Sequence, residues 1–227
     1  MPTLYIANKN YSSWSLRPWV LMRELGVPFE ERLLRFGDQA AWADFKKLSP
    51  HGKVPCLADG GLVVWESLAI VEYLAERHPS VWPAEGAARA YARSAAAEMH
   101  AGFAELRNRC SMSCGVRIRL HEITPTLTRD LARLEALWAD GIARFGGPFL
   151  AGKRFTAVDA FFAPVAFRVQ TYGLTLGAEA RAYVERLLAL PSMRAWYASG
   201  LEETFRDLPH EAEIAQVGHL LEDLRAR

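Results

Sequence analysis

Two short motifs near the start of the chain have the chemistry to hold a peptide. Pro55 follows Val54, and because proline has no amide hydrogen and its bond to Val54 can be cis at modest cost, Val54 can turn its own backbone groups outward. A ligand could pair with that backbone as an added strand. Glu66 and Ser67 open an apolar-periodic helix, so a carboxylate stands beside free helix amides that favour an anion. These groups suit the ammonium and carboxylate of one amino acid, and we predict a peptide-binding site.

The elements that must position these motifs alternate between strand and helix. The patterns predict strands at 3–7 and 29–34, helices at 15–25, 39–47 and 67–77, and a hairpin at 55–65. This βαβαββα order predicts a small mixed sheet with helices packed on it. Two prolines and a glycine in residues 79–86 are typical of a linker. We therefore expect an α/β domain at 1–78, a linker at 79–86 and an all-helical domain at 87–227.

The second half shows helical periodicity. We predict a long helix at 87–112, further helices at 127–145, 158–172, 178–190 and 193–201, and a last short helix at 217–224. Thr156 and Asp159 have the spacing of an N-capping box. Cys110 and Cys114 stand four residues apart. Two ligands without a clear third or fourth make a poor metal site, so we predict no metal site. The two cysteines are interpreted as buried small apolar residues or as part of a pocket wall.

Composition limits the partners of the chain. With 27 basic and 26 acidic residues the net charge is +1, so no bulk attraction to nucleic acid or to a membrane is expected. The first residues read as a strand rather than a signal peptide, and no apolar run reaches the roughly 18 residues of a membrane span. Three cysteines argue against a disulfide framework and fit a reducing compartment. We expect a soluble, cytoplasmic protein.

Taken together, these motifs resemble the cytosolic glutathione transferase family over roughly residues 1–201. The resemblance is carried by four segments, namely Tyr11 to Arg17, Ser49 to Pro55, Glu66-Ser67, and the capping box of Thr156 to Asp159. It implies a thioredoxin-like N-terminal domain that binds glutathione as a co-substrate, and a helical C-terminal domain that shapes the pocket for a small electrophile. It also implies a homodimer.

The serine segment is similar to the Ser-Ser-Cys-x-Trp-Arg signature of the zeta class. By that match Ser12 is the catalytic serine, with Ser13 as the alternative. Trp14 replaces the cysteine and Leu16 replaces the tryptophan of the signature. A redox cysteine is therefore missing, which disfavours a disulfide-reducing relative.

The chemistry expected at the serine is stabilisation of a thiolate. A thiol with a pKa near 8.5 is only about 3% thiolate at pH 7, and lowering that pKa by roughly 2 units needs about 2.7 kcal/mol. A hydroxyl donor and the amides of a helix N-terminus both favour negative sulfur, and Ser12 and Ser13 precede the helix at 15–25. The alternative is that these serines only cap the helix.

The resemblance also implies roles for the other candidate residues. Glutathione would be held by Lys53, Val54, Pro55, Glu66 and Ser67, where Lys53 reaches the glycyl carboxylate or is only a surface lysine. The second-substrate pocket would include Met112, Arg168 and Tyr172. The zeta-class arginine for the substrate carboxylate would fall at Thr171, with Arg168 one turn earlier. Four further arginines have two possible roles. They form a solvated helix face, or one or two of them face the cleft and favour an anionic co-substrate. They are Arg107, Arg109, Arg117 and Arg119.

These observations predict a serine-type glutathione transferase, in which the thiolate of glutathione attacks an electrophilic carbon. A glutathione-dependent isomerase resembling maleylacetoacetate isomerase is the first alternative, and it would consume no glutathione. The second alternative is a non-catalytic, transferase-like binding module.

Overall fold

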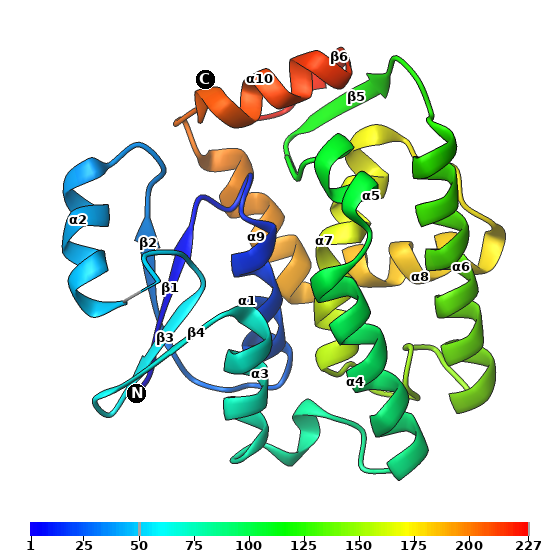
Figure 1. Cartoon of the computed structure of the whole chain (residues 1–227), viewed down its shortest axis with the longest axis horizontal. Coiled ribbons are helices and arrows are strands. Elements are labelled where there is room, and N and C mark those ends of the chain that lie inside the picture. The colour runs from blue at the N-terminus through cyan, green and yellow to red at the C-terminus, as the bar shows by residue number, and fades with distance from the viewer. Residues whose placement is uncertain (50, 227) are drawn as a thin grey trace.

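The computed structural model describes residues 1–49 and 51–226, and it has an α/β part beside a mainly helical part (Figure 1). The α/β part follows the predicted βαβαββα order. Its elements are β1 (Thr3–Ala7), α1 (Ser13–Glu24), β2 (Glu30–Leu34), α2 (Gln39–Leu48), β3 (Cys56–Asp59), β4 (Leu62–Trp65) and α3 (Ser67–Ala75).

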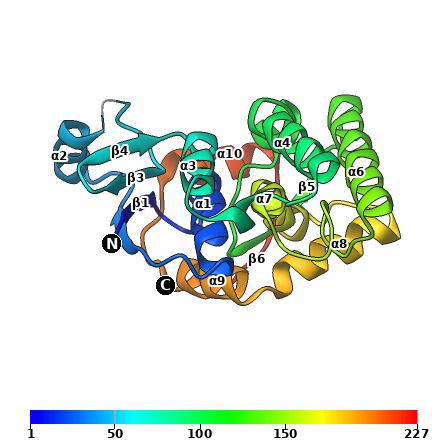
Figure 2. The same cartoon turned by 90° about the horizontal axis from the view of Figure 1, so that it is seen from below.

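The four strands form one mixed sheet in the order β2-β1-β3-β4. β1 runs parallel to β2, and β3 runs antiparallel to both β1 and β4. Helices α1 and α3 cover the face of the sheet that is turned toward the helical part, whereas α2 lies on the other side (Figures 1 and 2). Leu4 and Ile6 of β1 are fully buried because both side chains point to the face that α1 and α3 cover, whereas Tyr5 points to the other face and packs on Phe45 of α2.

The remaining elements build the helical part. They are η1 (Pro79–Val81), α4 (Gly86–Ala101), α5 (Ala104–Arg109), β5 (Val116–Leu120), α6 (Pro125–Phe145), α7 (Ala157–Tyr172), α8 (Ala178–Ala189), α9 (Pro191–Glu202), α10 (Leu208–Val217) and β6 (Gly218–Asp223). Val81 and Trp82, in the segment predicted as a linker, are buried in the core. None of the described helices combines the length and the apolar character needed to cross a membrane.

Helix α7 is the centre of the helical part and packs against α1, α4 and α8. It begins with the predicted capping box, in which the Asp159 carboxylate accepts hydrogen bonds from the Thr156 amide at 2.9 Å and from the Leu150 amide at 3.1 Å. The same carboxylate accepts a hydrogen bond from the Tyr183 hydroxyl at 2.9 Å. Burial raises the pKa of Asp159 to about 6. One carboxylate therefore joins α7, α8 and the loop before α7.

Two helix predictions are wrong. The helix predicted at 87–112 ends at Ala101, where Phe103 takes a left-handed conformation with φ of 53°. Cys110 and Cys114 lie beyond α5 in a loop, so they do not share a helical face. The segment predicted as a helix at 217–224 is strand β6, which pairs antiparallel with β5. The signal for β5 is the alternation of buried Val116 and Ile118 with arginines, which has the period of a strand.

Candidate functional site

A cavity of about 720 Å³ lies where the two parts of the chain meet, and we call it the large cavity to distinguish it from a smaller cavity that shares part of its lining. Its walls come from the loop before α1, the segment before β3, the region from α5 to Met112, helix α7 and helix α10. The lining residues are Tyr11, Ser12, Ser13, Trp14, Phe36, Trp42, Lys53, Val54, Arg107, Asn108, Ser111, Met112, Arg168, His210 and Glu213. A small cavity of about 180 Å³ shares three of them and is lined by Trp14, His51, Lys53, Val54, Pro55 and Glu66.

The serine pair lies at the start of α1. Ser12 is the N-cap residue, and its hydroxyl oxygen accepts a hydrogen bond from the Ser15 amide at 3.4 Å. The hydroxyls of Ser12 and Ser15 are hydrogen bonded at 2.8 Å, and Ser15 Oγ accepts a hydrogen bond from the Ala7 amide. The capping alternative is thus present in the structure, and Ser12 also lines the large cavity.

Ser13 and Tyr11 flank Ser12 and differ in how their hydroxyls are used. Among the described residues no hydrogen bond engages the Ser13 hydroxyl, which also faces the large cavity. The Tyr11 hydroxyl instead donates to Glu211 Oε1 at 2.6 Å and accepts from Arg225 at 3.1 Å. Burial raises the pKa of Tyr11 to about 12. The serines, and not the tyrosine, therefore have hydroxyls to offer a ligand.

The peptide-binding motifs meet at the small cavity. The Val54–Pro55 bond is cis, as the sequence allowed, and Val54 lines both cavities. Glu66 has a φ of 68°, a conformation that is rare for a residue with a side chain and is often found at binding sites. Its carboxylate lies 3.3 Å from His51 Nε2. Ser67 begins α3 and is buried, and its hydroxyl has no partner among the described residues.

The predicted second-substrate residues divide into two groups. Met112 and Arg168 line the large cavity. Tyr172 does not, because it lies behind the wall with its hydroxyl donating to the carbonyl of Ser111 at 2.9 Å. Thr171 is also turned away, and its hydroxyl donates to the carbonyl of Ser113 at 2.7 Å. Arg168 is therefore the α7 residue that faces the cavity.

Three arginines gather beside the large cavity without carboxylate partners among the described residues. Arg17 is buried between the rings of Trp14 and Phe161, with its guanidinium carbon 4.0 Å and 5.0 Å from the two ring centroids. Burial lowers the pKa of Arg17 well below its usual value, and repulsion from Arg168 and Arg107 adds to this. Arg168 donates from Nε to the carbonyl of Cys110 at 2.7 Å, and burial lowers its pKa to about 10.

Two family models match the chain, one for each part of the fold. The model described as "Glutathione S-transferase, N-terminal domain" matches residues 11–77, and the one described as "Glutathione S-transferase, C-terminal domain" matches residues 117–199. Together the two matches span well over half of the chain. The chain belongs to the glutathione S-transferase family.

Known members of this family share different stretches with the chain. A probable maleylacetoacetate isomerase of Caenorhabditis elegans is 33% identical over 47% of this chain and 50% of its own length, so the chain spans only half of that relative. A probable maleylacetoacetate isomerase of Vibrio cholerae is 27% identical over 80% of this chain and 89% of its own. The solved theta class glutathione S-transferase of Xanthomonas axonopodis, which has glutathione bound, is 25% identical with a TM-score of 0.63 and covers 86% of this chain and 96% of that one. The predicted family and fold class are confirmed.

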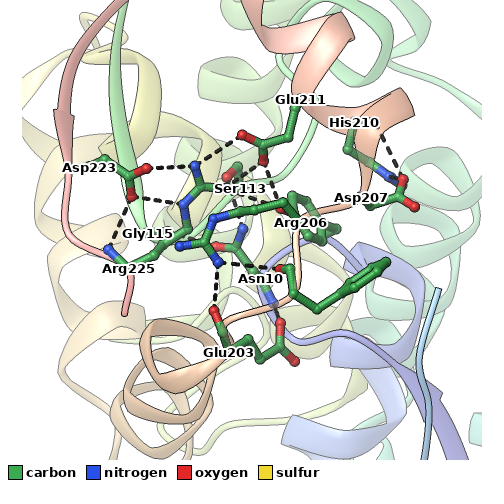
Figure 3. Close-up of polar contacts among 12 residues, drawn as sticks. Asn10, Ser113, Gly115, Glu203, Arg206, Asp207, His210, Glu211, Asp223 and Arg225 are labelled. Atoms are coloured by element: carbon green, nitrogen blue, oxygen red, sulfur yellow. Dashed lines mark hydrogen bonds and ion pairs between the residues drawn. The ribbon is translucent and has the colours of Figure 1, made fainter. Parts of the chain in front are cut away.

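Sequence reasoning missed the part of the site that comes from α10 and the segment after it. His210 and Glu213 of α10 line the large cavity. Arg225 anchors this segment, donating to Glu211 Oε2 at 3.0 Å and to Asp223 Oδ2 at 2.7 Å (Figure 3). A Cβ on Gly115 would lie 2.2 Å from Arg225 Cγ, so the guanidinium stem passes directly over that glycine. The polar tail has no helical or strand periodicity that would have revealed these roles.

The remaining candidates lie away from the cavities. Of the four arginines considered for an anionic co-substrate, only Arg107 lines the large cavity. Arg109 lies near Glu105 and Glu122, and Arg117 donates to the Tyr197 hydroxyl. Cys110 and Cys114 are buried, and burial raises the pKa of the Cys110 thiol to about 12. Within residues 1–49 and 51–226, no three histidine, cysteine or acidic side chains are placed to hold a metal ion.

Proposed function

We propose that this chain is a serine-type glutathione transferase that holds glutathione across the two cavities and attacks a small electrophile with its thiolate, a reaction that serves detoxification. The observation that carries the proposal is the composition of the large cavity. One wall offers the serine pair, Lys53 and Val54, and the opposite wall offers Met112 and Arg168 from the helical part. A thiol held at the first wall would face an electrophile held at the second.

In this proposal the Ser12 hydroxyl donates to the thiolate. Its oxygen already accepts a hydrogen bond from the Ser15 amide, and hydroxyl hydrogens rotate freely. When sulfur is present, the Ser15 hydroxyl can donate to Ser12 and leave the Ser12 hydrogen for sulfur. A hydroxyl that accepts two hydrogen bonds is a stronger donor, because hydrogen bonds in a chain polarise one another. Ser13 remains the alternative donor because its hydroxyl is unengaged.

The rest of glutathione would lie along the segment before β3. The Val54 backbone would pair with the cysteinyl unit, and Lys53, which borders both cavities, would approach the glycyl carboxylate. Glu66 would take the ammonium group of the γ-glutamyl end. The carboxylate at that end would meet Ser67 and the first amides of α3, where the helix dipole favours negative charge.

The electrophile that fits this cavity best carries an anionic group. Arg107 and Arg168 line the wall that would face it, and Arg17 adds a buried guanidinium behind them. Buried charges without partners are costly, so an anion that reaches them gains more than it would from exposed arginines. A carboxylate on the electrophile is the simplest such group.

A glutathione-dependent isomerase is the second candidate, because two relatives of the chain are described as probable maleylacetoacetate isomerases. The thiolate would then add to the substrate reversibly and leave again. Product analysis separates the two candidates, since an isomerase consumes no glutathione. A non-catalytic binding module would bind glutathione without turning over any electrophile.

We further propose that the chain is cytoplasmic and forms a homodimer. The apolar stripe on α6 packs inside the subunit and leaves little surface for assembly, because Leu131, Leu134 and Trp138 are buried. Leu62 and Trp65 of β4 are instead exposed by 54% and 40% and offer an apolar surface for a second copy. We also propose that the α/β domain ends at residue 78 and that the helical domain begins after residue 86.

The test is a glutathione titration by calorimetry, combined with thiolate absorbance against pH, on the wild type and on Ser12→Ala and Ser13→Ala. We expect the wild type to bind glutathione and to lower its thiol pKa by roughly 2 units. Ser12→Ala should still bind glutathione but lose the pKa shift and most conjugating activity, and Ser13→Ala should keep both.

Three outcomes would change the assignment. If Ser13→Ala loses the shift and Ser12→Ala keeps it, Ser13 is the donor and Ser12 only a cap. If both variants keep full activity, neither hydroxyl activates the thiol. If the wild type does not bind glutathione, the transferase proposal fails.

A further inference from the structure

Helix α10 brings a histidine–aspartate pair to the large cavity. His210 lines the cavity, and its Nδ1 lies 2.5 Å from Asp207 Oδ2 (Figure 3). The two side chains are 28% and 13% exposed, so the pair is largely enclosed while the ring remains open to the cavity. An aspartate on one ring nitrogen sets the orientation and tautomer of the imidazole and leaves the other nitrogen for a ligand.

Helix capping alone does not account for this pair. Asp207 is the N-cap residue of α10 and accepts a hydrogen bond from the His210 amide at 3.4 Å, which already fulfils the capping role. The bond to the ring is additional and shorter. Within the described residues Nε2 makes no hydrogen bond, so the second nitrogen is unengaged on a ring that borders the cavity.

The ring also packs against Tyr11, the residue before the serine pair. Its centroid lies 5.0 Å from that of Tyr11 and 5.3 Å from that of Phe36, and both of these residues line the same cavity. Tyr11 directly precedes Ser12, and its hydroxyl is fixed by Glu211 of α10. The contacts between Tyr11 and α10 therefore hold the imidazole in the wall of the cavity that the serine pair also lines.

We propose that His210, oriented by Asp207, is a proton donor to the electrophile, and that the substrates it serves are alkenes conjugated to a carbonyl group. This rests on the proposed function, because it needs a thiolate at the serine pair. The thiolate sulfur forms a bond to the β-carbon of the alkene, and the displaced electron pair moves to the carbonyl oxygen. The doubly protonated ring of His210 gives its Nε2 proton to that oxygen, which leaves an enol and a neutral imidazole whose remaining proton is on Nδ1, toward Asp207.

The protons balance because the solvent carries one proton from glutathione to the imidazole. The imidazole takes up one proton, which replaces the one that glutathione released on becoming a thiolate, and the enol relaxes to the ketone. In the reverse direction the neutral imidazole takes the proton back as the thiolate leaves, which is the step an isomerase needs. Substitution on an aromatic halide expels a halide ion and needs no such donor, so the two reactions separate the role of His210 from that of the serines.

The experiment compares two probes on the full chain, chlorodinitrobenzene for substitution and benzylideneacetone for addition to a conjugated alkene. His210→Gln should lose about 100-fold in kcat/KM with benzylideneacetone and change by less than about threefold with chlorodinitrobenzene. Added imidazole should restore part of the addition activity of His210→Ala, which a purely structural role would not allow. Asp207→Asn keeps a good capping residue and should lose addition activity selectively.

The matched control is His219→Ala, since His219 is exposed on β6, outside both cavities, and should leave both reactions unchanged. Equal losses with the two probes, or no rescue by imidazole, would overturn the role of His210. A wild type that conjugates chlorodinitrobenzene but not benzylideneacetone would also overturn it and leave the transferase proposal intact. A wild type that uses neither probe and binds no glutathione would instead refute the proposed function.

Discussion

Tyr11 and Ser12 are neighbours in the chain, yet the structure uses their hydroxyls in opposite ways. The tyrosine hydroxyl is held between Glu211 and Arg225, and burial raises its pKa to about 12. Among the described residues the Ser12 hydroxyl is hydrogen bonded to the Ser15 hydroxyl and the Ser15 amide at the start of α1. In the proposed mechanism a serine therefore activates the thiol, while the tyrosine secures the segment that covers it.

At the residue scale, Arg107 offers a direct test of the preference for anionic electrophiles. We expect Arg107→Gln to raise KM for a carboxylated electrophile about tenfold, because a charge-assisted hydrogen bond is lost, and to leave a neutral electrophile nearly unaffected. Steady-state kinetics at two salt concentrations would measure this, and the wild-type KM for the anionic substrate should increase with salt. Arg109→Gln is the matched control, since Arg109 lies outside the cavity near Glu105 and Glu122. Equal changes for both electrophiles would contradict the prediction.

The site residues that the sequence revealed are those close together in the chain. Ser12, Val54 and Glu66 belong to short motifs whose local geometry is encoded by the neighbouring residues, such as a capping serine or an X-Pro step. His210 and Asp207 could not be found in this way. They reach the cavity through contacts between distant parts of the chain, in which Glu211 of α10 and Arg225 both bond the Tyr11 hydroxyl.

At the element scale, α7 depends on one buried carboxylate. The Asp159 side chain accepts hydrogen bonds from the amides of Leu150 and Thr156 and from the Tyr183 hydroxyl. The preceding loop, the helix start and α8 therefore share a single acceptor. Its loss would leave several buried donors unsatisfied at once.

We expect Asp159→Ala to lower the free energy of unfolding by about 3 kcal/mol or more, because buried donors left without partners each cost about 1–3 kcal/mol. Urea unfolding followed by circular dichroism would measure the change. Asp140→Ala is the control, because Asp140 forms only a half-exposed pair with Arg144 and should change stability by less than about 1 kcal/mol. A similar midpoint for the two variants would show that the shared acceptor is not needed.

The sequence predicted the elements whose periodicity is unambiguous. Strand β1 and the helices from α6 to α9 were located to within a few residues, because their apolar positions repeat regularly. The break after Ala101 was missed because the flanking residues are good helix formers, and only Gly102 marks it. Strand β6 was missed because its exposed leucines, Leu220 and Leu221, fit a helical pattern as well as a strand.

At the scale of the whole molecule, the segment after α9 fastens the helical part to the N-terminal part. Glu203 accepts a hydrogen bond from the Asn10 amide (Figure 3) and another from the Lys9 amide. Arg225 donates a hydrogen bond to the Tyr11 hydroxyl. Arg225 also lowers the pKa values of the two carboxyl groups that it contacts, Asp223 and Glu211. Hydrogen bonds from Arg225 hold the pKa of Asp223 below its usual value, and those from Arg225 and Tyr11 outweigh burial and lower the pKa of Glu211.

This pairing predicts release of the tail in acid. Because both carboxyl groups have lowered pKa values in the folded protein, their contribution is present above their ordinary values near pH 4 and is lost as the pH falls below that range. Hydrogen exchange read by mass spectrometry should show residues 203–226 losing protection before the sheet does. Arg225→Gln should expose the same segment already at pH 7, whereas Arg129→Gln, on the exposed side of α6, should not. A tail that stays protected in Arg225→Gln would refute this account.

The hydrogen bond between Arg225 and Tyr11 joins residues that are 214 positions apart. On a ribosome the serine pair is therefore made long before the side chain that fixes its neighbour. A nascent chain that has completed its sheet and most of its helices still lacks His210, Glu211 and Arg225. If the site works as proposed, glutathione chemistry therefore begins only after nearly all of these residues have been synthesised.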